Sequence, residues 1–467
     1  MMTMHKHRSA NDSNAVKPNV AKALLLRAIA DIDEAINEQI NAILHHERFQ
    51  QIEASWRGLR YLCGQAGTQD NHSTCKVKLL NVSWRDLCRD SARAIDFDQS
   101  DLFRHLYTAE FSTPGGEPFG LVIGDYQITH RPRKGYPAAD LQVLRTISHV
   151  CAAAFAPFIT SAQASLFGVN HFSELASVQD IGAQFSQPEY GQWQALRAME
   201  DSRFLAIAAP NILMREPHKQ SGSGLTAFQF RETVGCSERD YLWGNAAYGV
   251  AGVAVRAFRE SGWFSQIRGM QPSKLKHGLM VEIPSSGFEH SRSSHSPRPS
   301  VNLQIGDRLE AELSDNGFIA ISTLPHTPHL VLYSNTTVNL PVSFDKQSAS
   351  VNARLSSMLQ YMLCVARFAH YLKVMGRDKV GGYNTAQQIE NEMQRWLHQY
   401  TAASDEASDE IRAKYPLNEA KIQVKEQQAK PGHYYSVIHL RPHFQLEHMV
   451  SNIRLITELS PIFTQVG

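Results

Sequence analysis

A glycine-rich stretch at residues 115–120 has the composition of a loop that cradles phosphate groups. It reads Gly-Gly-Glu-Pro-Phe-Gly, and the backbone amides of such loops bind phosphates where a strand joins a helix. The stretch lacks the Lys-Ser/Thr pair of a P-loop, and it precedes a predicted strand instead of joining a strand to a helix. We therefore interpret it as a tight turn in which the glycines supply positive φ angles.

Histidine and cysteine spacings do not assemble a metal site. His46-Glu47 begins like the metalloprotease motif His-Glu-x-x-His, but Gln50 stands where the second histidine is needed to put both rings on one helix face. His443 and His448 would lie on opposite faces of a strand. The six cysteines are scattered without a Cys-x-x-Cys pair. We predict neither a metal nor a cofactor.

Two charge clusters stand where an enzyme could hold a substrate. One contains Asp201 and Arg203, and the other is the sequence Arg-Asp-Lys at residues 377–379. Clusters at the ends of apolar segments are usually solvated or paired between subunits. The chain also lacks a Gly-x-Ser-x-Gly elbow and the kinase signatures, which favours a protein that is not an enzyme. An α/β enzyme whose pocket is built from distant residues is the alternative from another functional class.

The composition is that of an ordinary globular protein. Hydrophobic residues make up 43% of the 467-residue chain, which is long enough for roughly three average domains. The 46 Lys and Arg residues against 45 Asp and Glu residues argue against a nucleic-acid-binding protein. No signal peptide is present, and every apolar run is far shorter than the ~20 residues that span a bilayer. We expect a cytoplasmic protein without membrane insertion.

Helical periodicity predicts two amphipathic helices between Ala21 and Tyr61. Isoleucines recur at spacings of three and four over residues 29–43, and a second apolar series begins at Phe49. We expect the break between the helices near residues 45–48. Antiparallel packing of their apolar faces would then form a helical hairpin.

Alternating strand and helix patterns between residues 121 and 322 predict an α/β core. Ser83 with Asp86 three residues later predicts a helix N-cap, and residues 76–81 before it have a strand pattern. The expected core strands are 121–123, 158–160, 204–209 and 318–322, and the expected core helices are 141–155, 189–200, 248–258 and 307–313.

After residue 350 the pattern changes to helices followed by strands. We predict one long helix beginning near Val351 and a second helix at residues 386–400. Alternation with a period of two predicts strands around residues 421–425, 434–440 and 453–455. The predicted fold class is mixed α/β (α+β), with an N-terminal helical hairpin, an α/β core and C-terminal helices followed by β-strands.

Ordered blocks of distinctive residues recur along nearly the whole chain. The first covers residues 43–59 and includes Trp56 and Gly58. Further blocks are 200–203, 243–248, 366–373, 377–379, 393–397 and 440–447, and two more contain the signature residues Gly115, Gly116, Glu117 and Pro118, then Gly124, Asp125 and Tyr126. In this order they resemble the large sheath subunit of the bacterial type VI secretion system.

The resemblance implies a contractile sheath. A large subunit of this family pairs with a small sheath subunit, and the heterodimers stack with further copies into a helical polymer around an inner tube protein. Contraction on a membrane-anchored baseplate drives the tube and its spike out of the cell, and an ATP-driven unfoldase dismantles the contracted sheath. The resemblance further implies no catalytic residues, and C-terminal strands that neighbouring subunits share.

Two hypotheses about assembly surfaces follow. Edge strands offer unpaired amides and carbonyls, so the strands at 421–425 and 434–440 suit strand addition between chains, which a proline at Val437 would block. The interface residues predicted there are Ile422, Val424, Tyr435, Val437, His439 and Arg441. The second hypothesis assigns to a surface facing the tube or a neighbour the basic residues Arg367, Lys373, Arg377 and Lys379.

We expect a flexible tail at residues 1–20, a tail-sheath N-terminal domain at 21–350 and a C-terminal domain at 351–467. Residues 271–300, rich in Ser, Pro and His, and residues 323–350 are expected to be exposed and variable. Compared with the family, the N-terminal segment is short and residues 323–350 lack the usual sequence block. These departures bear on recognition by the unfoldase. They favour, as the alternative, an accessory paralogue that binds the sheath or baseplate without polymerising alone.

Overall fold

The computed structural model describes most of the chain and divides it into two compact units. The N-terminal unit comprises residues 1–54 and 215–242, and the core unit comprises residues 55–214 and 243–467. The described residues are 16–67, 75–111, 113, 115–218, 228, 230–235, 238–264, 266–270, 277–285, 300–324, 327, 329–379, 385–402, 408–426, 434–443 and 453–459.

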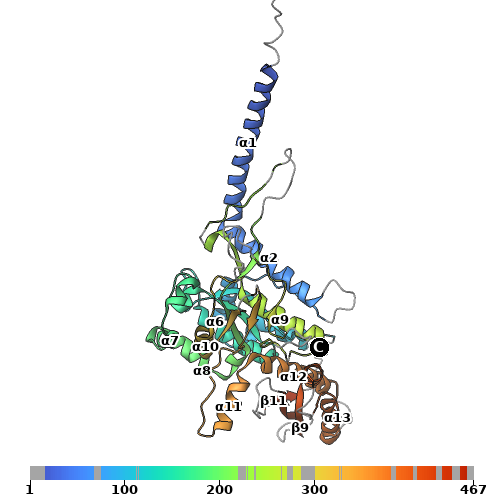
Figure 1. Cartoon of the computed structure of the whole chain (residues 1–467). Helices are drawn as coiled ribbons and strands as arrows, with labels where there is room; N and C mark the ends of the chain where they lie inside the picture. Colours follow the sequence, from blue (N-terminus) through green and yellow to red (C-terminus); the bar gives the residue numbers. More distant parts are fainter. Residues whose placement is uncertain are drawn as a thin grey trace, which may run out of the picture. The chain divides into compact units, whose positions relative to one another are not determined.

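The two N-terminal helices are confirmed. Helix α1 (Val16–Leu44) runs as one long helix in Figure 1, and α2 (Glu47–Ala66) begins after a break at residues 45–46. The expected packing of one apolar face on the other is not formed, because Ile32 on α1 and Ile52 on α2 are 59% and 53% exposed. Residues 1–15 of the expected tail lie outside the described residues, and residues 16–20 belong to α1.

The core unit contains a mixed six-stranded sheet with the strand order β1-β2-β3-β7-β8-β6. Neighbours from β1 to β7 pair in parallel, whereas β8 pairs antiparallel with both β7 and β6. The strands β2 and β3 are buried along their whole length. β3 is apolar throughout, as buried parallel strands usually are, whereas β2 also buries Thr160 and Ser161. The bounds are β1 (Val122–Ile128), β2 (Phe158–Ala162), β3 (Leu205–Ala209), β6 (Leu279–Met280), β7 (Phe318–Thr323) and β8 (Leu330–Leu332).

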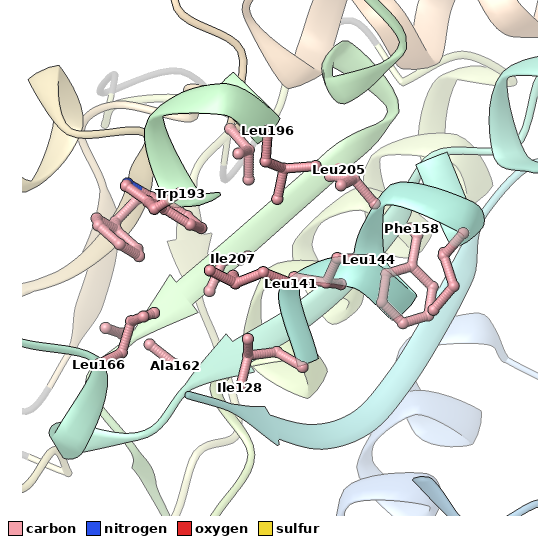
Figure 2. Packing of buried hydrophobic residues seen from close by; sticks show 14 of the residues in the cluster. Ile128, Leu141, Leu144, Phe158, Ala162, Leu166, Trp193, Leu196, Leu205 and Ile207 are labelled. Atoms are coloured by element: carbon pink, nitrogen blue, oxygen red, sulfur yellow. The ribbon is translucent and has the colours of Figure 1, made fainter. Parts of the chain in front are cut away.

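Helices cover this sheet, as the sequence periodicity predicts. Figure 2 shows side chains of α6 and α8 meeting those of β1, β2 and β3 in one apolar cluster, and α9 contacts the same three strands. The predicted cap is present, because the Ser83 side chain accepts a hydrogen bond from the Asp86 amide. The helices are α3 (Trp84–Arg93), α4 (Asp101–Phe103), α5 (Ala109–Phe111), α6 (Asp140–Ala154), α7 (Ile181–Phe185), α8 (Gly191–Ala198), α9 (Ala246–Ser261) and α10 (Asp307–Asp315).

Three expectations differ from the structure. Residues 323–350, expected to be exposed, contain the fully buried strand β8 of the core sheet, because its apolar side chains pack inside the core unit. Residues 76–81 form no strand, and the Lys78 side chain there binds Glu110 instead. The long helix expected from Val351 is divided into α11 (Gln347–Ser356) and α12 (Leu359–Lys379). The break forms because residues 357–359 exchange backbone hydrogen bonds with residues 335–337, which a continuous helix could not do.

The C-terminal part combines helices with a separate antiparallel sheet, as expected. Its strand order is β11-β10-β9, and α13 packs on β9. The mixed α/β fold class is therefore confirmed, while the sharing of strands between subunits stays a prediction. The remaining elements are β4 (Ile212–Arg215), β5 (Leu242–Gly244), α13 (Ala386–His398), α14 (Asp409–Lys414), β9 (Leu417–Glu426), β10 (Tyr434–Pro442) and β11 (Ile453–Leu459).

Candidate functional site

The inner face of the C-terminal sheet contains two of the six predicted interface residues. Ile422 and Val424 are 2% and 7% exposed and pack in one cluster with Ile438 and Leu440. Side chains of α12 and α13 complete that cluster. Ile422 and Val424 therefore stabilise this chain's own core.

The outer face of the same sheet contains the other four residues. Alternation along β10 directs them away from the face of Ile438, and the register places them opposite residues 419–425 of β9. Tyr435, His439 and Arg441 are partly exposed, whereas Val437 is 7% exposed. This outer face is the part of the predicted interface that a neighbouring chain could reach.

The expected edge character of β10 is wrong. β10 pairs with β9 on one side and with β11 on the other, so its amides and carbonyls face strands of the same chain. The sequence pattern predicts where strands lie, but it does not determine which of three strands is central. A proline at Val437 would therefore disturb this chain's own sheet.

Lys373 and Arg377, predicted to face a tube or a neighbour, bind residues of the core unit. The Lys373 ammonium donates to the Tyr107 hydroxyl at 2.9 Å and lies 4.6 and 4.7 Å from the ring centroids of Tyr107 and Phe111. Arg377 donates to the Phe111 carbonyl at 3.1 Å. Tyr107 lies in a single π-helical turn, residues 104–108. These contacts attach α12 to the segment before β1.

Arg367 also contacts neighbouring side chains. Its guanidinium donates to the Tyr371 hydroxyl at 2.9 Å and stacks 4.6 Å from the Tyr371 ring centroid and 5.5 Å from that of Phe258. The side chain of Lys379 lies outside the described residues. A tube-facing role for the four basic residues stays a prediction.

The Gly-Gly-Glu-Pro signature forms the turn that the sequence predicts. Gly115 has a φ of +80°, and a Cβ on Gly116 would lie 2.2 Å from the Glu110 carbonyl oxygen. The Glu117 amide donates to the Glu110 carboxylate at 2.8 Å, and the Glu117 carboxylate accepts from Lys76. The following residue, Pro118, leads towards β1. This segment is a structural turn.

The Gly-Asp-Tyr signature joins β1 to its neighbours. A Cβ on Gly124 would lie 2.3 Å from the Phe158 ring, so only glycine fits there. The Tyr126 hydroxyl donates to the Val82 carbonyl at 2.8 Å, and burial raises the pKa of Tyr126. The carboxylate of Asp125 is a hydrogen-bond partner of Tyr248 on α9.

Two signature residues of α2 have different environments. Gly58 allows close approach of Tyr248, because a Cβ there would lie 2.4 Å from its ring. Trp56 is 63% exposed, in line with Ile52 one turn earlier. Gly58 thus serves packing, and Trp56 belongs to an exposed apolar face.

The sequence does not predict a buried charge network in the N-terminal unit. Arg215 is 6% exposed and donates to Glu232 at 3.0 Å and to Glu53 at 2.9 Å. Glu232 also binds a His45 ring nitrogen at 3.2 Å and accepts from the His218 amide at 2.8 Å. Burial by itself would raise the pKa of Glu232, but the hydrogen bonds from Arg215 and His218 outweigh burial and lower it.

The described residues offer little for metal or membrane chemistry. Among them, no three His, Cys, Asp or Glu side chains gather closely enough to hold a metal ion. His46 is exposed, and Gln50 donates to the Arg239 carbonyl instead. Within the same residues, no helix has the length and apolarity needed to cross a bilayer.

Comparison with known proteins covers nearly the whole chain. Residues 26–339 match the family model described as EvpB/VC_A0108, tail sheath N-terminal domain, and residues 348–459 match the tail sheath gpW/gp25-like domain of the same family. The type VI secretion system sheath protein TssC1 of Pseudomonas aeruginosa is 34% identical over 435 residues, which are 92% of this chain and 85% of TssC1.

Solved structures give weaker likenesses. A chain of the anti-feeding prophage baseplate is 10% identical with a TM-score of 0.38, and the match covers 81% of this chain and 82% of that one. The sheath tail protein of Desulfitobacterium hafniense is 8% identical with a TM-score of 0.33, covering 70% and 62%.

The match of both family models and the identity to TssC1 agree with the resemblance carried by the residue blocks. The family consists of structural sheath proteins and not of enzymes. This chain belongs to the EvpB/VC_A0108 tail-sheath family and is a homologue of the large subunit of the type VI secretion contractile sheath.

Proposed function

We propose that this chain is a main-sheath subunit that pairs with a small sheath subunit and polymerises into a helical tube around an inner tube protein. The polymer is attached in the cytoplasm to a membrane-anchored baseplate, and its contraction propels tube and spike. An ATP-driven unfoldase then disassembles it. Membership of the sheath family implies that the chain forms a helical polymer. What we propose in addition is that its partners are the small sheath subunit, the inner tube protein, the baseplate and the unfoldase.

The observation that carries this proposal is the apolar surface left open on α1. Eight of its large apolar residues are between 39% and 65% exposed, and five of these lie on one face of the helix: Leu25, Ile29, Ile32, Ile36 and Ile43. Monomeric soluble proteins rarely leave such a stripe uncovered, because each buried aliphatic side chain stabilises by about 1.5 to 3 kcal/mol.

The spacing of this stripe favours a helix as the covering element. Residues 25, 29, 32, 36 and 43 follow the three-and-four rhythm of a helix–helix seam. Of the nearby acidic residues, Asp33 lies beside the seam, whereas Glu34 and Glu38 lie on the opposite face of the helix. We assign this seam to the small sheath subunit.

We further propose that the chain has two functional domains, at residues 21–350 and 351–467, after a tail at residues 1–20. The two family models support this division, since the first ends at residue 339 and the second begins at residue 348.

Co-expression with the small sheath subunit encoded beside it tests the proposal. Tubes that contain both proteins, collected by ultracentrifugation and seen as hollow cylinders in negative stain, are the expected result. A soluble complex without tubes would identify an accessory paralogue instead, and a chain that binds no sheath protein would contradict the proposal.

A further inference from the structure

The outer edge of β9 is covered by side chains of α13. Gln394 accepts a hydrogen bond from the Ile422 amide at 2.9 Å through its carbonyl oxygen and donates to the Ala420 carbonyl at 2.8 Å. Glu390 accepts from the Val424 amide at 2.8 Å. The two side chains, one helical turn apart, therefore occupy three backbone groups of the edge that faces away from β10.

An incoming strand would need these three groups among its hydrogen-bond partners. In an antiparallel pair, alternate residues direct their amides and carbonyls to opposite sides, so residues 420, 422 and 424 all face the outer edge of β9. A strand that adds to an edge gains affinity mainly from such main-chain hydrogen bonds. Gln394 offers both a donor and an acceptor, as a backbone peptide group would.

The surrounding packing fixes α13 in this position. Ile389, Met393 and Leu397 are each at most 2% exposed and lie in the same apolar cluster as Ile422 and Val424. Thr385 and Gln388 form a capping box that begins the helix. The packed helix therefore holds the Glu390 and Gln394 side chains beside the edge of β9.

The other end of the sheet differs. The strand order β11-β10-β9 makes β11 the second edge, and no described strand pairs with its outer side. We propose that Glu390 and Gln394 act as a side-chain seal that closes the β9 edge, so that a strand from another subunit adds to this sheet only along β11.

This inference rests on the proposed function for the identity of the incoming strand, but the seal itself is a property of this chain. Natural sheets close exposed edges to prevent self-pairing, and a polymer built by strand addition has a particular need for this. If both edges accepted strands, subunits could add with either polarity. A sealed β9 edge permits addition in one direction only.

The test removes the seal in the full chain co-expressed with the small sheath subunit. Amide hydrogen exchange at Ile422 and Val424 is measured by mass spectrometry for wild type and for the Glu390→Ala/Gln394→Ala variant. We expect about tenfold faster exchange at both amides, the effect of losing a hydrogen bond that protects each. Asn391→Ala, an exposed change on the same helix, is the matched control and leaves both amides protected.

Self-association provides the second readout. Sedimentation velocity should show concentration-dependent assembly of the double variant alone, and protection at Ile422 and Val424 should return as concentration rises, because a second chain then binds them. Glu390→Gln, which keeps an acceptor oxygen, should behave like wild type. Glu390→Ala alone, which is milder than the double change, should speed exchange at Val424 only.

Unchanged exchange in the folded double variant would overturn the seal, as would faster exchange without any new association. A different result would show that the proposed function is wrong. Wild type would then form no tubes with the small subunit, while the exchange and association differences between wild type and variants would persist.

Discussion

At the scale of single residues, the buried network around Glu232 makes the sharpest prediction. Replacing Glu232 with glutamine leaves Arg215 buried without its main counter-charge, which should lower the free energy of unfolding by about 3 kcal/mol. Urea denaturation followed by circular dichroism measures this loss at pH 7. Glu216→Gln, an exposed change beside Arg215, is the control and should cost little.

The same variant predicts a pH dependence. Because the pKa of Glu232 is lowered in the folded chain, its carboxylate stabilises fully above its ordinary value of 4.5, and this contribution is lost as pH falls through the folded pKa. The difference between wild type and Glu232→Gln should therefore be constant from pH 7 to 5 and shrink below about pH 4.5. A difference that already shrinks near pH 6 would contradict this assignment.

Lys373 supports a second prediction, on the attachment of α12. Lys373→Met keeps the length of the side chain but removes the hydrogen bond to Tyr107 and the attraction to two aromatic rings, and should destabilise the fold by about 1 to 3 kcal/mol. Thermal unfolding measures the effect. A variant as stable as wild type would show that these contacts contribute nothing. Charge reversal at Lys373 would disturb folding and so is a poor probe of a tube-facing surface.

Residue-level features are predictable from sequence when they are local. The Ser83 cap and the turn at Gly115 depend on neighbours within a few positions, and both are present as predicted. Arg215 and Glu53 are 162 positions apart, so no spacing in the sequence connects them. Lys373 and Tyr107 are 266 positions apart, which is why sequence alone predicts an exposed charge at Lys373.

At the scale of elements, substitutions in the exposed apolar stripe of α1 should affect assembly without affecting folding. Ile32→Asp/Ile36→Asp should leave the melting temperature of the isolated chain nearly unchanged, because both side chains are already exposed. Binding of the small sheath subunit should weaken at least about tenfold, since each aliphatic side chain contributes about 1.5 to 3 kcal/mol when buried. Pull-down with a tagged small subunit measures this binding.

The matched control changes the other side of the same helix. Glu34→Ala/Glu38→Ala should retain the small subunit, because these exposed residues lie outside the apolar stripe. Equal binding by wild type and both double variants would mean that the stripe is not the contact surface.

The sequence predicts where helices and strands lie better than it predicts which other elements they contact. Core strands and helices follow from periodicity, whereas the α11–α12 break depends on hydrogen bonds to residues 335–337 that periodicity does not contain. In the C-terminal sheet, the strand positions are predictable, but the central place of β10 and the sealed edge of β9 are tertiary features. The sequence-based expectation of edge strands is therefore wrong for β10, whereas β9 is an edge strand whose outer side carries hydrogen bonds from α13.

At the scale of the whole molecule, near-neutrality suits a subunit that is repeated many times. With 46 basic and 45 acidic residues, each copy adds little long-range repulsion to a growing stack. Local clusters of charge can still pair between neighbours. The 467 residues form two units. The N-terminal unit contains the exposed apolar helix α1, and the core unit contains the C-terminal sheet, in which α13 covers the β9 edge.

Time-lapse fluorescence of the tagged chain, expressed in the cells that encode it, shows whether this chain builds a contractile sheath. We expect rods that lengthen across the cell and then shorten abruptly, and the Ile32→Asp/Ile36→Asp variant should remain diffuse. Static foci or diffuse fluorescence of the unmutated chain, beside rods formed by another large subunit, would contradict it.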